Sequence, residues 1–185
     1  MMCQAKRAGY ERQHTALDLH DRKCDLNLAR LHKAGIQGVR TVSGDACELD
    51  EVLTSFDAMR GERVKFDTVF IDAPCSGTGT MRRHPEIPWR LTENDVTTDL
   101  PKLQLTMLKE AAARVAAGGE LIYATCSSST RRTHRWWTRS LLLPSAGFSV
   151  APLSEAQILQ LPEFDQAKKL LASVKTTVAF SKVCR

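Results

Sequence analysis

Short apolar runs alternate along this chain with segments in which apolar residues recur at helical spacing. In one such segment Cys24, Leu28 and Leu31 stand at i, i+4 and i+7, which predicts a helix over residues 21–34. The short apolar runs predict four strands, over residues 14–19, 39–43, 68–71 and 120–124. Because strands and helices alternate throughout, the pattern indicates an α/β fold with a parallel, doubly wound sheet.

Two further helices are expected between these strands. A short one is predicted near residues 49–59, and a longer one begins at Pro101, which the first helical turn tolerates because its N–H groups have no partner. Gly118 and Gly119 would end the longer helix. Its inner face would consist of Leu103, Met107, Ala111 and Val115.

Polar, reactive groups fall at the ends of the predicted strands. They are Asp18, Asp45, Asp72 and Cys126. Ligands of open parallel sheets bind beyond the carboxyl ends of the strands, so this placement predicts a site at one edge of the sheet. Asp18 has the position of an acid that binds ribose hydroxyls in nucleoside-cofactor folds, and Asp45 would contact the adenine end. Either carboxylate could instead only cap the next helix.

The stretch DAPCSGTG, residues 72–79, places an acid, a proline, a cysteine and a glycine-rich turn after a buried-looking run. Cys75 is therefore either a small buried hydrophobe or a reactive thiol. Enzymes that methylate exocyclic amines need only polar and stacking groups at the corresponding positions. A thiol here therefore suggests that the methylated atom is a ring carbon. A thiolate that adds to C6 of cytosine makes C5 nucleophilic, and an acid near N3 stabilises the resulting charge. Two cysteines and an aspartate around a flipped-out base suit this chemistry.

Two longer stretches carry a family resemblance. FDTVFIDAPCSGTGTMRRHPEIPWR (residues 66–90) and LKEAAARVAAGGELIYATCS (residues 108–127) closely resemble the RNA 5-methylcytosine methyltransferases of the bacterial ribosomal-RNA Sun/Fmu type, which are related to the Nop2/Sun proteins. The resemblance implies a Rossmann-like, S-adenosylmethionine-dependent methyltransferase sheet with helices on both faces. By similarity, Cys126 adds to C6, Cys75 assists release of the methylated RNA, and Asp72 lies between cytosine and cofactor. Asp18 and Asp45 would bind S-adenosylmethionine.

The front of the chain departs from that family. The family's first strand and its glycine-containing cofactor loop are expected before the Asp18 strand, and residues 1–13 would be only a remnant of the helix that follows them. The missing strand belongs between the Asp18 and Asp72 strands, so we expect a gap of two strand spacings, roughly 9–10 Å. The chain is thus interpreted as an N-terminally truncated, partial catalytic domain over residues 1–185, with residues 14–127 as its best-matching core.

The C-terminal part, residues 128–185, is expected to diverge from the family. Residues 128–143 contain no acid and show no helical period, and we interpret them as a compensated reading-frame slip. The tail, residues 170–185, lacks the aspartate-glycine-aromatic closing strand of the family.

Charge and composition narrow the setting. The net charge is +5, and Arg82 and Arg83 follow the Cys75 motif, where they would hold RNA phosphates. The six cysteines form no C-x-x-C pair, so neither a zinc site nor a disulfide framework is expected. We therefore expect a cytoplasmic protein, or a nucleolar or mitochondrial one if the source is a eukaryote. No stretch approaches the roughly 18 uncharged apolar residues of a membrane span. A monomer without metal is expected.

Two functions remain open from the residues. The first is an RNA cytosine-C5 methyltransferase, and the second is a catalytically impaired fragment or pseudoenzyme that at most binds RNA. A nicotinamide dehydrogenase would need a G-x-G-x-x-G turn after a strand, and a cysteine hydrolase would need a histidine paired with Cys75 or Cys126; the sequence indicates neither. Trp89, Trp136 and Trp137 are candidates for stacking on bases.

Overall fold

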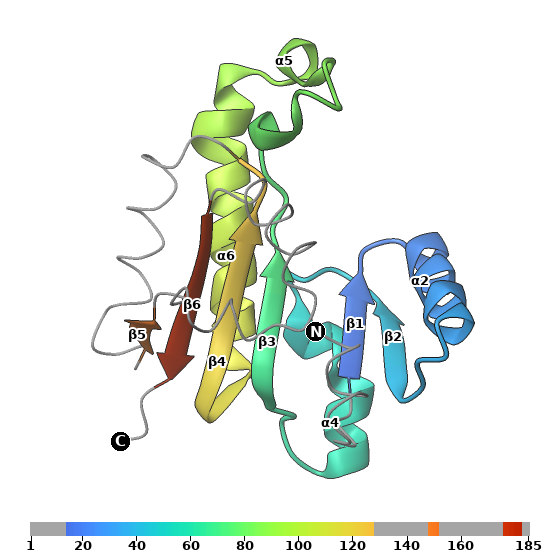
Figure 1. Cartoon of the computed structure of the whole chain (residues 1–185). Helices are drawn as coiled ribbons and strands as arrows, with labels where there is room; N and C mark the ends of the chain where they lie inside the picture. The colour runs from blue at the N-terminus through green and yellow to red at the C-terminus, as the bar shows by residue number, and fades with distance from the viewer. Residues whose placement is uncertain (1–13, 128–147, 152–175, 183–185) are drawn as a thin grey trace. The chain divides into compact units, whose positions relative to one another are not determined.

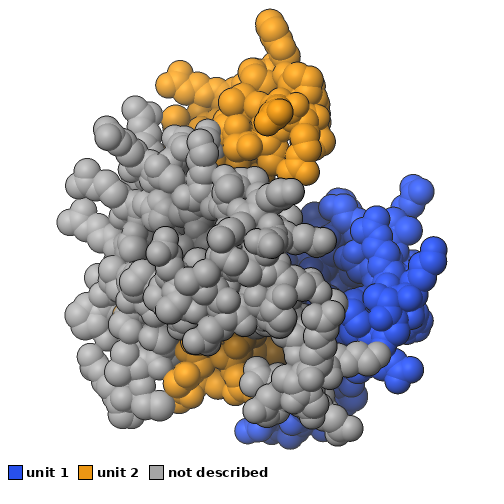
Figure 2. All heavy atoms as spheres, in the orientation of Figure 1, with its two compact units in different colours: residues 1–64 blue, residues 65–185 orange. Residues whose placement is uncertain are grey.

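A computed structural model describes residues 14–127, 148–151 and 176–182 of the chain (Figure 1). The chain divides into two compact units, Met1–Val64 and Lys65–Arg185, which Figure 2 distinguishes by colour. Each unit contains a sheet of its own. The proposed frameshifted segment, residues 128–143, lies outside the described residues.

The first unit is built on a parallel pair of strands. β1 (His14–Asp18) pairs with β2 (Val39–Ser43), and α2 (Asp21–Lys33) connects them. Both strands and the helix confirm the prediction, with bounds that differ by one residue at most. Gly35 follows α2 with φ of 67°, the left-handed conformation that favours glycine after a helix.

The helix predicted near residues 49–59 is in fact two short helices, α3 (Leu49–Val52) and α4 (Thr54–Arg60). They are separated by Leu53, whose side chain is buried and whose backbone leaves the regular helical conformation with ψ of 7°. The Thr54 hydroxyl donates a 2.9 Å hydrogen bond to the Asp50 carbonyl oxygen. Such side-chain bonds compete with the regular helical ladder, which gives a physical reason for the break.

The second unit contains a mixed sheet in the order β3-β4-β6-β5. Its strands are β3 (Phe66–Asp72), β4 (Val115–Thr125), β6 (Thr176–Lys182) and β5 (Phe148–Ala151). β3 runs parallel to β4, whereas β6 is antiparallel to both β4 and β5. The pairing of β3 with β4 is parallel as predicted, and β6 adds antiparallel pairing that the sequence did not predict. Among the described residues no ladder joins the strands of the first sheet to those of the second.

The C-terminal tail supplies a strand although it lacks the family's closing motif. The segment begins Thr-Thr-Val, a run of β-branched residues that favours extended backbone. β6 pairs along β4 from Thr176 opposite Thr125 to Ser181 opposite Glu120. The missing motif therefore did not mean a missing strand.

One described helix, α6 (Leu100–Ala113), packs on one face of β3 and β4 (Figure 1). A π-helical turn, Asp95–Asp99, precedes it. The predicted start near Pro101 is confirmed. The predicted inner face was right for Ala111, which is buried, but wrong for Leu103, which is exposed, and Val115 belongs to β4. The side chains that face the core are Gln104, Leu108 and Ala111.

The end of α6 was also mispredicted. The helix stops at Ala113, and Gly118 and Gly119 lie within β4, where the register with β3 shifts. A Cβ atom on Gly119 would lie 2.7 Å from the Asp67 carbonyl oxygen, so the close approach of β3 requires glycine there. The buried residues of α6 and β4 include Leu108, Ala111, Val115, Leu121 and Tyr123, which contribute to the core of this unit.

Candidate active site

The loops after β3 and β4 start side by side because the two strands end in register. Asp72, the last residue of β3, pairs with Ala124 near the end of β4. The Ala73 N–H donates a 3.0 Å hydrogen bond to the Ala124 carbonyl oxygen, and the Gly79 N–H donates one of 2.8 Å to the Cys126 carbonyl oxygen. These bonds fasten the DAPCSGTG loop to the loop that contains Cys126.

The two loops bring two free thiols together. The Sγ atoms of Cys75 and Cys126 are 3.1 Å apart, although the residues are 51 positions apart in sequence. Both side chains are half-buried. At this distance the S–H of one cysteine donates to the sulfur of the other. Of the residues predicted for the site, Asp72, Cys75 and Cys126 therefore gather at one edge of the second unit's sheet.

A second pair of side chains, which the sequence did not single out, joins the same two loops. The hydroxyls of Ser76 and Ser127 are 2.8 Å apart, and the Thr78 hydroxyl is 3.2 Å from Ser76. Ser76 is buried, so these bonds satisfy a hydroxyl that would otherwise lack water. The repeated Cys-Ser dipeptide at residues 75–76 and 126–127 was the available signal.

Gln104 of α6 is hydrogen-bonded to the DAPCSGTG loop. Its Nε2 donates a 2.7 Å hydrogen bond to the carbonyl oxygen of Pro74, the residue before Cys75. The side chain is only 3% exposed, and its Oε1 has no hydrogen-bond partner within the described part of the chain. This glutamine was missed because a polar residue on the inner face of a helix does not fit a search for apolar periodicity.

The environment of Cys126 favours the protonated thiol. Burial, which is the largest effect, raises the pKa of Cys126 to about 11, and the hydrogen bond and charge of Cys75 and the charge of Asp72 act in the same direction. Burial also raises the pKa of Tyr123, on β4. Cys126 in the free chain is therefore a thiol at neutral pH and needs a proton acceptor before it can act as a nucleophile.

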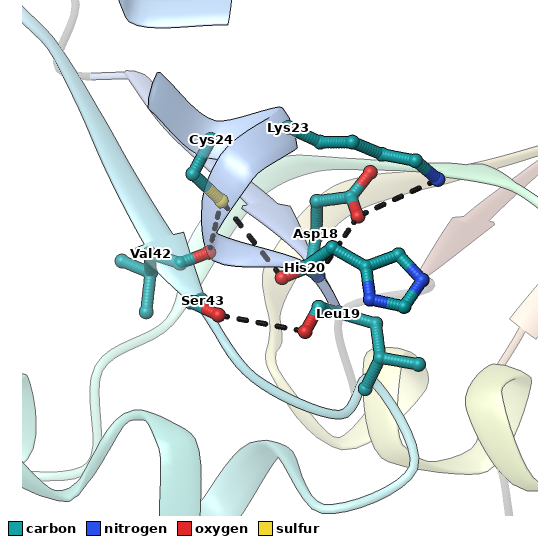
Figure 3. Close-up of polar contacts among 7 residues, drawn as sticks. All are labelled: Asp18, Leu19, His20, Lys23, Cys24, Val42 and Ser43. Atoms are coloured by element: carbon teal, nitrogen blue, oxygen red, sulfur yellow. Dashed lines mark hydrogen bonds and ion pairs between the residues drawn. The ribbon is translucent and has the colours of Figure 1, made fainter. Parts of the chain in front are cut away.

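Asp18 and Asp45 belong to the first unit, where Asp18 is the last residue of β1 and Asp45 follows β2. Asp18 Oδ1 accepts a 3.0 Å hydrogen bond from the His20 N–H and lies 3.8 Å from Lys23 Nζ (Figure 3). Asp45 Oδ1 accepts a 2.8 Å bond from the Cys47 N–H. The two acids are held near each other through the 3.0 Å bond from the Gly44 N–H to the Asp18 carbonyl oxygen. The predicted strand-end groups thus gather in two sets, one in each unit.

Cys24 has a structural place in the first unit. It is buried in α2, and its thiol donates to the Val42 carbonyl oxygen over 3.3 Å (Figure 3). Arg82 and Arg83, predicted to contact RNA, are exposed in the segment that follows the DAPCSGTG loop.

Two further features are absent from the described ranges. No group of three or more histidine, cysteine or acidic side chains is placed to hold a metal ion. Within the same residues, no helix combines the length and the apolar character that crossing a membrane requires.

The fold is that of the Rossmann-like methyltransferases. The structure resembles PH0851 with a TM-score of 0.63 and 28% identity, over 77% of this chain and 30% of that one. It also resembles NSun6 from Pyrococcus horikoshii, solved with SFG, with a TM-score of 0.58 and 20% identity over 76% of this chain and 32% of that one.

Sequence relatives identify the family. The family model for the 16S rRNA methyltransferases RsmB/F matches residues 6–147, so the chain belongs to that family, and the predicted Sun/Fmu resemblance is confirmed. The chain is 34% identical over 113 residues to the probable ribosomal RNA small subunit methyltransferase B of Bacillus subtilis (strain 168), which covers 61% of this chain and 23% of that protein. The ribosomal RNA small subunit methyltransferase B of Vibrio vulnificus (strain YJ016) is also 34% identical, over 63% of this chain and 25% of that protein. The chain thus spans about a quarter of these relatives.

Proposed function

We propose that this chain belongs to an S-adenosylmethionine-dependent enzyme that methylates C5 of a cytosine in ribosomal RNA through a covalent cysteine-C6 adduct. The observation that carries the proposal is the 3.1 Å separation of the Cys75 and Cys126 sulfurs, beside Asp72, in a member of the RsmB/F family. Methylation of an amine or a hydroxyl needs no thiol, whereas methylation of a pyrimidine carbon needs a nucleophile that adds and leaves.

Cys126 is the proposed nucleophile. Its raised pKa means that the thiol must lose a proton as it attacks C6, and Cys75, as the thiolate of the singly ionised pair, is positioned to accept that proton. The new S–C6 bond pushes the electron pair of the C5–C6 double bond into the ring. Asp72, at the end of β3, would stabilise the ring near N3 by a proton or hydrogen bond while C5 takes the methyl group.

Cys75 has its proposed role in the second half of the reaction. After methylation, the C5 proton passes to a water molecule, and its electron pair re-forms the C5–C6 double bond as the S–C6 bond breaks. Cys126 then leaves as a thiolate, and the neighbouring Cys75 thiol can return a proton to it. The pair thereby starts the next cycle in its original protonation state.

The first unit offers groups for the cofactor. All described contacts of the Asp18 carboxylate use Oδ1, so Oδ2 suits a ribose hydroxyl, and Asp45 lies close by for the adenine end. S-adenosylmethionine, when bound, supplies the electrophilic methyl group. SFG in NSun6 accords with a ligand of this class in the fold.

Trapping with RNA that contains 5-azacytidine tests the proposal, because nitrogen at position 5 prevents the adduct from resolving. With S-adenosylmethionine, the unaltered chain should form a denaturation-resistant protein–RNA adduct, Cys126→Ala should form none, and Cys75→Ala should still form it, but more slowly. Cys47→Ala, a half-buried cysteine of the first unit, is the matched control and should retain the adduct. An adduct that persists in Cys126→Ala contradicts the nucleophile assignment. Absence of both adduct and cofactor binding in the unaltered chain would leave the alternative, a fragment that at most binds RNA.

A further inference from the structure

Trp89 is presented to solvent in a way that is unusual for tryptophan. It lies in the short helix α5 (Ile87–Arg90) and is 91% exposed. Burial of an aromatic ring is favourable, so large rings seldom remain this exposed without a partner. The exposed side chain of Met81 lies a few residues earlier in the same segment. The exposed ring is thus available for contact with another molecule.

The charges around Trp89 select the kind of partner. The segment from Met81 to Arg90 contains three exposed arginines, at positions 82, 83 and 90. Its single acid, Glu86, lies 3.3 Å from the ring nitrogen of His84 and is thus engaged within the segment. An excess of arginine attracts a phosphate backbone, and an aromatic ring among arginines is the usual arrangement of single-strand nucleic-acid sites.

The segment is anchored to the active-site loop. Gly77 has φ of 67°, and a Cβ there would lie 3.1 Å from Cδ1 of Ile87, which shows that Ile87 of α5 packs directly on this glycine. The Thr80 hydroxyl and N–H both donate to the Gly77 carbonyl oxygen over 2.8 Å. The Gly79 N–H is hydrogen-bonded to the Cys126 carbonyl oxygen, so a short stretch of backbone connects α5 to the thiol pair.

We infer that Trp89 is a stacking platform for an unpaired base of the RNA, next in sequence to the target cytosine, and that Arg82, Arg83 and Arg90 bind the adjoining phosphates. This inference rests on the proposed function and adds to it the requirement for a single-stranded substrate. A base in a duplex is already stacked on both faces and cannot lie on the ring. The target cytosine must itself leave its stack to reach Cys126, so an unpaired neighbour is chemically consistent.

Stacking and phosphate binding differ in their response to salt. Each phosphate contact to a single strand contributes about 0.7 to the slope of log affinity against log salt, whereas stacking contributes nothing to that slope. Removal of Trp89 should therefore weaken binding without changing the slope. Removal of Arg83 should weaken binding and reduce the slope.

The experiment measures fluorescence anisotropy of the 185-residue chain with labelled single-stranded oligocytidylate, over a range of salt concentrations. Trp89→Ala should weaken binding about 5- to 100-fold with an unchanged salt slope, and Trp89→Phe should stay within about threefold of the unaltered chain. Arg83→Gln should lower the slope by about 0.7. Met59→Ala, an exposed apolar residue of the first unit, is the control and should change nothing. A labelled RNA duplex should lose no affinity in Trp89→Ala.

The outcomes separate the two proposals. If the unaltered chain binds the oligonucleotide and Trp89→Ala binds equally well, the platform is refuted and the ring serves a protein contact, while the proposed function stands. Equal loss of duplex and single-strand affinity in Trp89→Ala also refutes base stacking. If the unaltered chain binds no RNA at all, both proposals fail.

Discussion

The sulfur of Cys75 lies 3.1 Å from the sulfur of Cys126, so the two thiols share one hydrogen bond. Two thiolates at this separation would repel each other strongly in a half-buried site. The pair therefore loses its first proton more easily than its second, and the raised pKa of Cys126 belongs in part to its neighbour.

The alkylation rate of Cys126 should report this coupling. In the unaltered chain the rate with iodoacetamide should rise through an apparent pKa of about 11. Cys75→Ala should move the midpoint down, yet leave it above the ordinary value of about 8.5, because burial is the largest cause and remains. Mass spectrometry of the Cys126 peptide, with Cys47 as the internal control, measures both rates. An identical profile in the two proteins would contradict the coupling.

Stability should fall in alkaline solution for the same reason. The thiol of Cys126 ionises less readily in the folded chain than in the unfolded one, so it contributes stability below the unfolded pKa of about 8.5. That contribution should be lost as the pH rises towards about 11. Tyr123, whose pKa is also raised, acts in the same direction at higher pH. Urea unfolding at stepped pH should therefore show a shallower decline in Cys126→Ala than in the unaltered chain.

Gln104→Leu should loosen the loop that presents Cys75. The substitution removes the donor to the Pro74 carbonyl oxygen, which should cost about 1 kcal/mol in the free energy of unfolding. Without this hydrogen bond the loop would no longer hold the Cys75 sulfur at a fixed distance from the Cys126 sulfur. The alkylation profile of Cys126 should therefore shift towards that of Cys75→Ala. Leu103→Ala, on the exposed side of the same helix, is the control. Loss of stability without any change in alkylation would mean that Gln104 supports the core alone.

Gly119→Ala should destabilise the second unit by about 1–3 kcal/mol, because the new methyl group would overlap the Asp67 carbonyl oxygen and contact Val115. Gly61→Ala is the informative comparison, since Gly61 has φ of 70° but nothing within 4 Å of the added carbon. It should cost about 1 kcal/mol from backbone strain alone. Thermal unfolding of both variants separates steric overlap from strain, and equal losses would contradict the close approach of β3 to Gly119.

Elements with strong local patterns were predictable from the sequence. The spacing of Cys24, Leu28 and Leu31 located α2, and the apolar runs located β1, β2 and β3. The inner face of α6 was predicted only in part, since Ala111 is buried as expected but Gln104 is buried for a hydrogen bond and not for its hydrophobicity. β6 was overlooked because its pairing with β4 is a long-range contact that no local pattern encodes.

The candidate site was predictable in outline only. Since adjacent parallel strands end at the same edge, Asp72 and Cys126 could be expected together, and Cys75 followed from its place in the loop. The bond between Ser76 and Ser127 could not be anticipated in the same way. It depends on the register of β3 against β4 and on the course of two loops, which only the folded chain defines.

The position of β6 has a genetic consequence. Thr176 and Thr177 pair with Thr125 and Ala124, the last two residues before Cys126. A nonsense mutation just upstream of codon 176 would leave every residue of the thiol site in place. It would nevertheless remove β6, and with it the hydrogen-bonded neighbour on one side of β4, the strand that ends before Cys126. Screening for loss of the thiol chemistry should therefore return lesions in codons 176–182 as well as in the cysteine codons themselves.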